Sequence, residues 1–169
     1  MLPPTLFIFS APVHSGKTSA LMAWAEDRTD LGGFLAPDLE GVRHLFTLRD
    51  RRMHPFQVRE QTVPSEELVT ICRYHFSAST FALARQMLIE DALRPMPWLV
   101  VDEVGKLELQ GLGHEPALSE VIRMHHTGAY RGKLLLVVRT ELLGDVMEKY
   151  RLHSATVLSD LRALTATDG

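Results

Sequence analysis

A short apolar run that leads into a glycine–lysine loop and then into a helix-forming segment restricts the fold of this chain more than any other feature. Residues 5–10 are typical of a buried strand, and residues 19–27, rich in Ala and Leu, favour a helix. The connecting residues 11–19 read APVHSGKTS and match the pattern G-x-x-x-x-G-K-[ST] except at its first glycine, which is Ala11 here. This order of strand, loop and helix predicts an α/β fold.

The second half of the chain alternates between helical and strand-like segments. We expect helices at residues 79–93, at 116–126 and from a cap at Thr140 to residue 150. Apolar runs at 98–101 and 134–138 are typical of strands that are buried on both faces, and residues 156–158 are a last, short strand candidate. The pattern therefore predicts a mostly parallel sheet between helices.

The middle of the chain, residues 31–77, carries β-branched and aromatic residues between turn signals. We expect an antiparallel β-meander with strands at 33–36, 42–48, 55–59 and 72–76, although residues 64–70 also fit a short helix. Cys72 is then a buried strand residue. The simplest division is a single domain, residues 1–169, with this meander as an insertion.

Charge and cysteine content exclude several classes of protein. Lys and Arg number 18 and Asp and Glu number 21, so the net charge of −3 lacks the basic surplus of a dedicated nucleic-acid binder. The single cysteine cannot form an internal disulfide. The apolar runs fall far short of the ~20 residues that span a bilayer, and the N-terminal run lacks the basic start of a signal peptide. We expect no membrane span and a reducing, cytoplasmic location.

The glycine–lysine loop has the composition of a phosphate-binding site. Its backbone N–H groups and the N-terminus of the following helix would converge on an anion, and Gly16 would allow close approach. Lys17 would bridge the β- and γ-phosphates, and the Thr18 hydroxyl would bind Mg²⁺. The expected nucleotide-binding residues of the loop are Ala11, Pro12, Val13, His14, Ser15, Gly16, Lys17, Thr18 and Ser19. The alternative is a simple turn with a solvated Lys17.

Two adjacent carboxylates follow the apolar run at 98–101. Ligands bind at the carboxyl edge of a parallel sheet, where both carboxylates are expected to lie. Asp102 would hold Mg²⁺ through water, and Glu103 would polarise the attacking water as general base. The expected catalytic residues are thus Lys17 and Glu103, and the expected metal ligands are Thr18 and Asp102. Without the loop, a helix cap would be the better interpretation of the pair.

Five segments of the chain carry a resemblance to a known family: the loop, the run VVDEVGKLEL, the GGFLAP segment, residues 41–48 and RYHFS ahead of a helix. Together they resemble the small cancer-related nucleoside-triphosphatase family of bacteria, archaea and animals. The resemblance covers nearly the whole chain, and DEVGKLEL is its most specific part. It implies a P-loop NTPase core with a β-rich insertion and a magnesium-dependent hydrolase of ATP and other nucleoside triphosphates. It also implies that Gly105 and Lys106 belong to a nucleotide-binding acidic box.

The chain departs from this family at two places. The loop begins with Ala11 instead of glycine, and SDLRAL stands where the family has an Asn-Arg pair after the last strand. The chain contains no asparagine at all, so only the arginine of this pair is present, as Arg162. Arg162 could stack on a base through its planar guanidinium, or it could lie on a solvated helix surface. Arg139, between an apolar strand and the Thr140 cap, is a further nucleotide-binding candidate near the γ-phosphate.

Other polar clusters give weaker indications. Arg49, Arg51 and Arg52 with Asp50 form a cationic turn that we expect to be solvated, although it could contact an acidic ligand. The segment HEPAL at His114 fails the zinc-protease pattern H-E-x-x-H at its last position.

The leading functional hypothesis is hydrolysis of ATP or another nucleoside triphosphate, such as GTP, to the diphosphate and phosphate. The alternatives are a nucleotide or small-molecule kinase and a non-catalytic nucleotide-dependent binding module. A signalling GTPase is disfavoured, because its guanine-reading element needs an asparagine. The sequence indicates no particular protein partner.

Overall fold

Parallel strands form the centre of the molecule. The structure, a computed structural model, describes residues 5–59 and 64–165. In this part of the chain, the parallel strands lie in the order β11 (Thr156–Leu158), β1 (Leu6–Ala11), β10 (Lys133–Arg139), β9 (Trp98–Asp102) and β2 (Leu31–Leu35). The antiparallel strands β4 (Val42–Thr47), β3 (Asp38–Leu39) and β5 (Arg52–Pro55) extend the sheet beyond β2.

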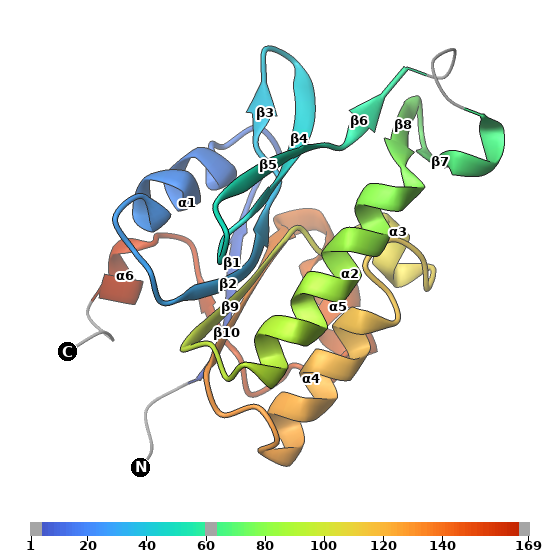
Figure 1. Ribbon diagram of the computed structural model, residues 1–169. Coiled ribbons are helices and arrows are strands. Elements are labelled where there is room, and N and C mark those ends of the chain that lie inside the picture. The colour runs from blue at the N-terminus through green and yellow to red at the C-terminus, as the bar shows by residue number, and fades with distance from the viewer. Residues whose placement is uncertain (1–4, 60–63, 166–169) are drawn as a thin grey trace.

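Helices cover both faces of this sheet (Figure 1). Helices α1 (Lys17–Ala25) and α6 (Arg162–Thr165) lie on one face, and α2 (Ala78–Leu93) and α4 (Ala117–Thr127) on the other. The short helices α3 (Lys106–Leu109) and α5 (Leu143–Lys149) pack on the same face as α2, and a 3₁₀ turn (Thr140–Leu142) precedes α5. The predicted α/β fold with a mostly parallel sheet between helices is confirmed.

Alternating side chains of the central strands build two separate hydrophobic cores, as the two-residue period of a strand requires. On β1, Phe7 and Phe9 pack with α1 and α6, whereas Leu6 and Ile8 pack with the helices of the opposite face. Strand β10 alternates in the same way. All residues of β9 are buried, as expected for a strand covered by helices on both sides.

One predicted pairing is wrong. The segment 33–36 was expected in an antiparallel meander, but β2 pairs in parallel with β9, with Leu31 opposite Trp98 and Phe34 opposite Val101. Only its other edge is antiparallel, where it meets β4. The glycines that suggest a turn serve close packing instead: at Gly33 the φ angle is +82°, and a Cβ would lie 2.0 Å from the Val100 carbonyl oxygen. The division of the chain into one domain with an insertion stays a prediction.

The rest of the middle segment forms a second, three-stranded antiparallel sheet. Strand β8 (Tyr74–Ser77) lies between β6 (Gln57–Val58) and β7 (Leu68–Ile71), and a 3₁₀ turn (Ser65–Glu67) precedes β7. The predicted strands at 55–59 and 72–76 are confirmed in part, because residues 57–58 and 74–76 are antiparallel strand residues, whereas Phe56 and Cys72 lie outside the strands. Cys72 is not a buried strand residue but an exposed turn residue with a φ of 54°. Of the short helix that residues 64–70 could also have formed, only one 3₁₀ turn is present, at Ser65–Glu67.

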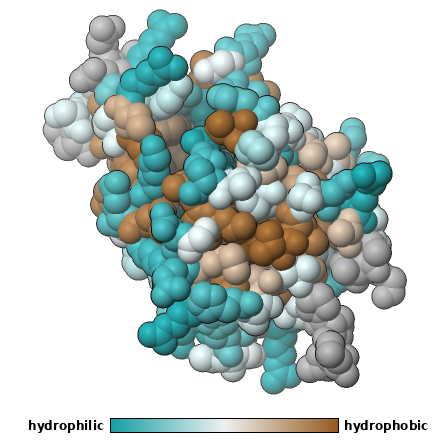
Figure 2. Space-filling model, turned by 180° about the vertical axis from the view of Figure 1, so that it is seen from behind, coloured by the Kyte–Doolittle hydropathy of each residue, from teal (hydrophilic) through white to brown (hydrophobic). Residues whose placement is uncertain are grey.

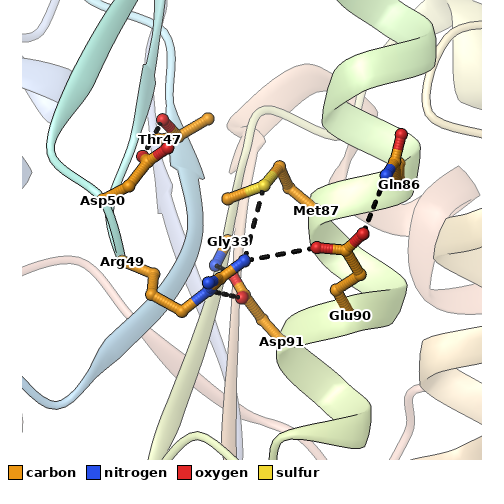
Figure 3. A network of polar contacts seen from close by, with 8 residues as sticks. All are labelled: Gly33, Thr47, Arg49, Asp50, Gln86, Met87, Glu90 and Asp91. Atoms are coloured by element: carbon orange, nitrogen blue, oxygen red, sulfur yellow. Dashed lines mark hydrogen bonds and ion pairs between the residues drawn. The ribbon is translucent and has the colours of Figure 1, made fainter.

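The turn between β4 and β5 is tied to helix α2 (Figure 3). Arg49 forms ion pairs with Asp91 and, at 3.3 Å, with Glu90, while the second oxygen of Asp91 accepts the Gly33 backbone N–H at 2.8 Å. The expectation of a solvated arginine turn is therefore wrong for Arg49, whose guanidinium fixes this turn to the core.

The opposite side of the molecule presents a mixed surface. Seen from behind, apolar side chains gather in a band across the middle, between hydrophilic side chains above and below (Figure 2). None of the helices in the described part of the chain is long and apolar enough to cross a membrane.

Candidate functional site

The carboxyl ends of four neighbouring strands bring the predicted site residues to one edge of the sheet. Ala11 at the end of β1 lies opposite Arg139 at the end of β10, and Asp102 at the end of β9 lies opposite Val137 of β10. Ala36 directly follows β2. The loop after β1, Arg139 and the carboxylates of Asp102 and Glu103 lie together because the carboxyl ends of parallel strands coincide at one edge of the sheet.

The predicted phosphate loop connects β1 to α1 through residues 12–16 and is held by Lys17, the first residue of α1. Lys17 is buried, and its Nζ donates to the carbonyl oxygens of Ala11 at 3.2 Å and of Pro12 at 3.0 Å. Gly16 precedes α1 with a φ of 81°, and His14 is also left-handed at 58°. Ala11, by contrast, is the last residue of an extended strand, where a Cβ causes no strain.

Asp102 is the most buried carboxylate of the site, at 1% exposure. Its Oδ2 accepts hydrogen bonds from the Thr18 hydroxyl at 2.8 Å and from the Ala36 backbone N–H at 3.1 Å. Its Oδ1 is equally buried but has no hydrogen-bond partner among the described residues. Burial raises the pKa of Asp102, and the two hydrogen bonds and the cations Arg43 and Lys17 oppose that rise.

Glu103 forms an ion pair with Arg139, with 3.1 Å between Oε1 and Nε. Burial also raises the pKa of Glu103; Arg139 lowers it, and the neighbouring Asp102 charge raises it. The side chain is 22% exposed. Glu103 is thus a partly desolvated carboxylate that still reaches the open site, as a proton acceptor requires.

Two adjoining cavities open at this edge. The first, which we call the loop cavity, has a volume of about 490 Å³ and is lined by residues 13–19 together with residues of α1 and of the β2–β3 connection. The second, the insertion cavity, measures about 310 Å³ and extends toward β7, β8, α2 and α3. Arg43, Glu103 and Arg139 line both cavities.

The structure separates some of the predicted nucleotide-binding residues. Ser15 and Ser19 line only the loop cavity, Val13 and His14 line both cavities, and Gly105 and Lys106 line only the insertion cavity. Arg162 lines neither cavity: it is exposed and forms an ion pair with Asp160 at 2.5 Å.

Sequence reasoning missed two contributors to the site. Arg43 on β4 lines both cavities and donates to the Ala36 carbonyl oxygen at 3.3 Å, and the Ala36 N–H holds Asp102. Ala36 lies in the GGFLAP segment and Arg43 in residues 41–48, two segments that carry the family resemblance but assign neither residue a role. Only the pairing of β2 beside β9 reveals them.

The arrangement was compared with known proteins. No protein-family model and no curated protein matches the chain. Among solved structures, the chain is similar to the crystal structure of THEP1 from the hyperthermophile Aquifex aeolicus, with a TM-score of 0.66 and 17% sequence identity over 90% of this chain and 88% of that one. The chain therefore shares the fold of that protein.

Proposed function

We propose that this protein is a magnesium-dependent nucleoside-triphosphatase, similar to the small cancer-related family, which hydrolyses ATP or other nucleoside triphosphates to the diphosphate and phosphate. The observation that carries the proposal is the contact between Thr18 and Asp102 directly beside the phosphate loop. This contact brings together the hydroxyl and the carboxylate that a magnesium-dependent phosphoryl transfer needs, and Glu103 directly follows Asp102 in the chain.

Thr18 and Asp102 suit a magnesium ion. The unpartnered Oδ1 of Asp102 is a buried negative group that a hard cation would satisfy, and hydroxyl and carboxylate oxygens are the ligands such a cation prefers. Among the described residues no cluster of three or more His, Cys, Asp or Glu side chains could hold a metal by itself. The ion would therefore be shared with phosphate oxygens, and it would supply charge neutralisation on the transferred phosphate.

Side chains and backbone groups of the protein would carry out the remaining steps. Lys17 would exchange the carbonyl oxygens of Ala11 and Pro12 for β- and γ-phosphate oxygens, while backbone N–H groups of the loop and the N-terminus of α1 bind the same anion. Glu103 would take the proton of the attacking water. Arg139, released from Glu103, would face the charge that develops on the γ-phosphate.

We also place this activity in a reducing, cytoplasmic compartment. Cys72 is the single cysteine of the chain and is exposed as a free thiol, which an oxidising compartment would leave open to modification.

The substitution Glu103→Gln tests the proposed base. It should retain nucleotide affinity but lower phosphate release by about 10²- to 10⁴-fold, the usual contribution of a general base. Glu141→Gln is the matched control, because Glu141 is exposed on the 3₁₀ turn that follows β10. Phosphate release is measured over a panel of nucleoside triphosphates with and without Mg²⁺. Turnover of the Glu103 variant at the parent rate would remove Glu103 from the mechanism.

The substitution Lys17→Ala tests the location of the site. It should abolish magnesium-dependent phosphate release, because Lys17 is the buried cation of the loop. Nucleotide binding is followed by titration with a fluorescent ATP analogue. If the variant hydrolyses ATP like the parent, the site lies elsewhere in the molecule. Tight binding by the parent without any phosphate release would instead identify a non-catalytic binding module.

A further inference from the structure

The insertion cavity is not explained by phosphate binding. It shares Glu103, Arg139 and Arg43, and also Val13 and His14 of the loop, with the loop cavity, and Asp102 lines it, but Lys17 and Thr18 do not. A ligand in this cavity would therefore lie next to the proposed base and away from Lys17 and Thr18, with only Val13 and His14 of the loop at its border. Its volume of about 310 Å³ is at the lower end of the range for small-molecule sites, and far larger than one attacking water needs.

Aromatic rings form one wall of this cavity. Phe56, Phe76 and Phe81 make a mutual cluster with ring centroids 4.7 to 6.1 Å apart, and all three line the cavity. Phe81 also contacts the ring of His114, with 5.2 Å between centroids. Apolar and aromatic walls of this kind bind planar rings by stacking and by burial of apolar surface.

The same wall carries one polar group without a partner. His114 lines the cavity at 3% exposure, and its Nδ1 has no hydrogen-bond partner among the described residues. The His114 backbone N–H is held by the Glu108 carboxylate at 3.3 Å, so this segment is fixed against α3. Burial lowers the pKa of His114 to about 3, which leaves a neutral imidazole at physiological pH. Such a ring nitrogen suits one hydrogen bond to a heteroaromatic ligand.

We propose that the insertion cavity binds a second substrate, a heteroaromatic ring that bears an alcohol, as a nucleoside does, and that this alcohol receives the γ-phosphoryl group in place of water. The inference rests on the proposed function for the placement of the γ-phosphate beside Glu103. The alcohol oxygen forms a bond to the γ-phosphorus, and the bond from that phosphorus to the β,γ-bridging oxygen breaks. The nucleoside diphosphate leaves, and the alcohol proton passes to Glu103.

Cys72 offers a direct test of this site. It is the only cysteine of the chain, it is exposed, and it lines the insertion cavity but not the loop cavity. Transfer of labelled γ-phosphate from ATP to adenosine, guanosine, cytidine and uridine is measured before and after treatment with a bulky maleimide. Phosphate release without any nucleoside is measured in parallel. The variant Cys72→Ser, which has no thiol, controls for reaction of the reagent elsewhere.

We expect at least one nucleoside to become phosphorylated and to slow modification of Cys72 at least tenfold. Maleimide treatment should then lower transfer to that nucleoside at least tenfold, with less than a twofold change in phosphate release. The Cys72→Ser variant should transfer phosphate equally before and after treatment. The substitution His114→Phe keeps an aromatic ring but removes Nδ1, and should raise the nucleoside KM about tenfold with little change in kcat.

The outcomes separate the inference from the proposed function. If phosphate is released normally but no nucleoside is phosphorylated or protects Cys72, the second-substrate site is refuted and the hydrolase stands. If maleimide treatment abolishes ATP binding, the cavity holds part of the nucleoside triphosphate itself, which also refutes the inference. Transfer to a nucleoside without release to water would support the second site and overturn the hydrolase.

Discussion

Replacing Arg49 by methionine removes the cation that lies against a fully buried carboxylate. Asp91 is 0% exposed, and without Arg49 its only remaining hydrogen bond within the network of Figure 3 is the one from the Gly33 backbone N–H. Removal of one partner from a buried ion pair costs about 3 to 5 kcal/mol. Since the Arg49 side chain is itself 25% exposed, the lower end of that range is expected. The contact with the more exposed Glu90 adds little.

Thermal unfolding of Arg49→Met and Arg52→Met provides the measurement. For a domain of this size about 3 kcal/mol corresponds to a fall in Tm of roughly 6 to 12 °C. Arg52 is the first residue of β5, directly after the turn, and is exposed, so its replacement should change stability by less than about 0.5 kcal/mol. Equal Tm values for the two variants would refute the idea that the Arg49–Asp91 pair anchors the turn.

A double-mutant cycle with Asp91→Asn isolates the pair. Once Asp91 is neutral, loss of Arg49 no longer leaves a buried charge, so the combined effect should be smaller than the sum of the single effects. A coupling energy between about 0.5 and 3 kcal/mol is expected from urea unfolding of the four proteins. Strict additivity would show that Arg49 acts through packing alone, for example on Met87, to whose sulfur its Nη2 lies at 3.6 Å.

Two further changes test the fold and the insertion cavity. Gly33→Ala should prevent folding or lower Tm far more than Gly41→Ala. Both glycines have a φ near +80°, but only the Gly33 Cβ meets a backbone atom, at 2.0 Å, so comparable melting curves would contradict the observed packing of β2 on β9. Burial lowers the pKa of His114 from its ordinary value of 6.5 to about 3. Below pH 6.5 the unfolded chain therefore binds a proton at His114 that the folded protein does not, so the folded state loses stability as the pH falls. Relative to His114→Phe, the parent should lose about 2 kcal/mol between pH 6.5 and 5, measured by urea unfolding, and parallel pH profiles would show that His114 does not titrate in this way.

Local patterns were sufficient to predict the parallel core and the edge of the sheet at which the candidate site residues lie. The apolar runs of β1, β9 and β10 identify strands buried on both faces, and a strand followed by Gly16-Lys17-Thr18 and a helix specifies the loop. Helix α2 was also anticipated to within one residue, and it begins where the Ser77 side chain accepts the Thr80 backbone N–H at 3.2 Å. Because the carboxyl ends of parallel strands coincide, Asp102 and Glu103 could be placed next to the loop.

The middle segment could not be predicted because its determinants are non-local. Gly32 and Gly33 suggest a turn, yet they are needed so that Asp91 and the Val100 carbonyl can approach β2 closely. Cys72 occupies a left-handed turn position that the sequence would assign to Gly or Asn, so the hairpin between β7 and β8 was overlooked. Arg43 lies in residues 41–48, whose pattern assigns it no role, and it reaches the site only through the pairing of β4 with β2.

The outer strands of the large sheet influence whether the molecule aggregates at high concentration. In the described part of the chain, the outer strand at one end, β11, is three residues long. At the other end lie β3, with two residues, and β5, with four residues ending in Pro55, which lacks a backbone N–H. Long, flat outer strands recruit strands of other molecules and start aggregation, whereas short or proline-terminated ones offer few free donors. The buried, strongly apolar strands at the centre are thereby kept from serving as a template for intermolecular β-structure.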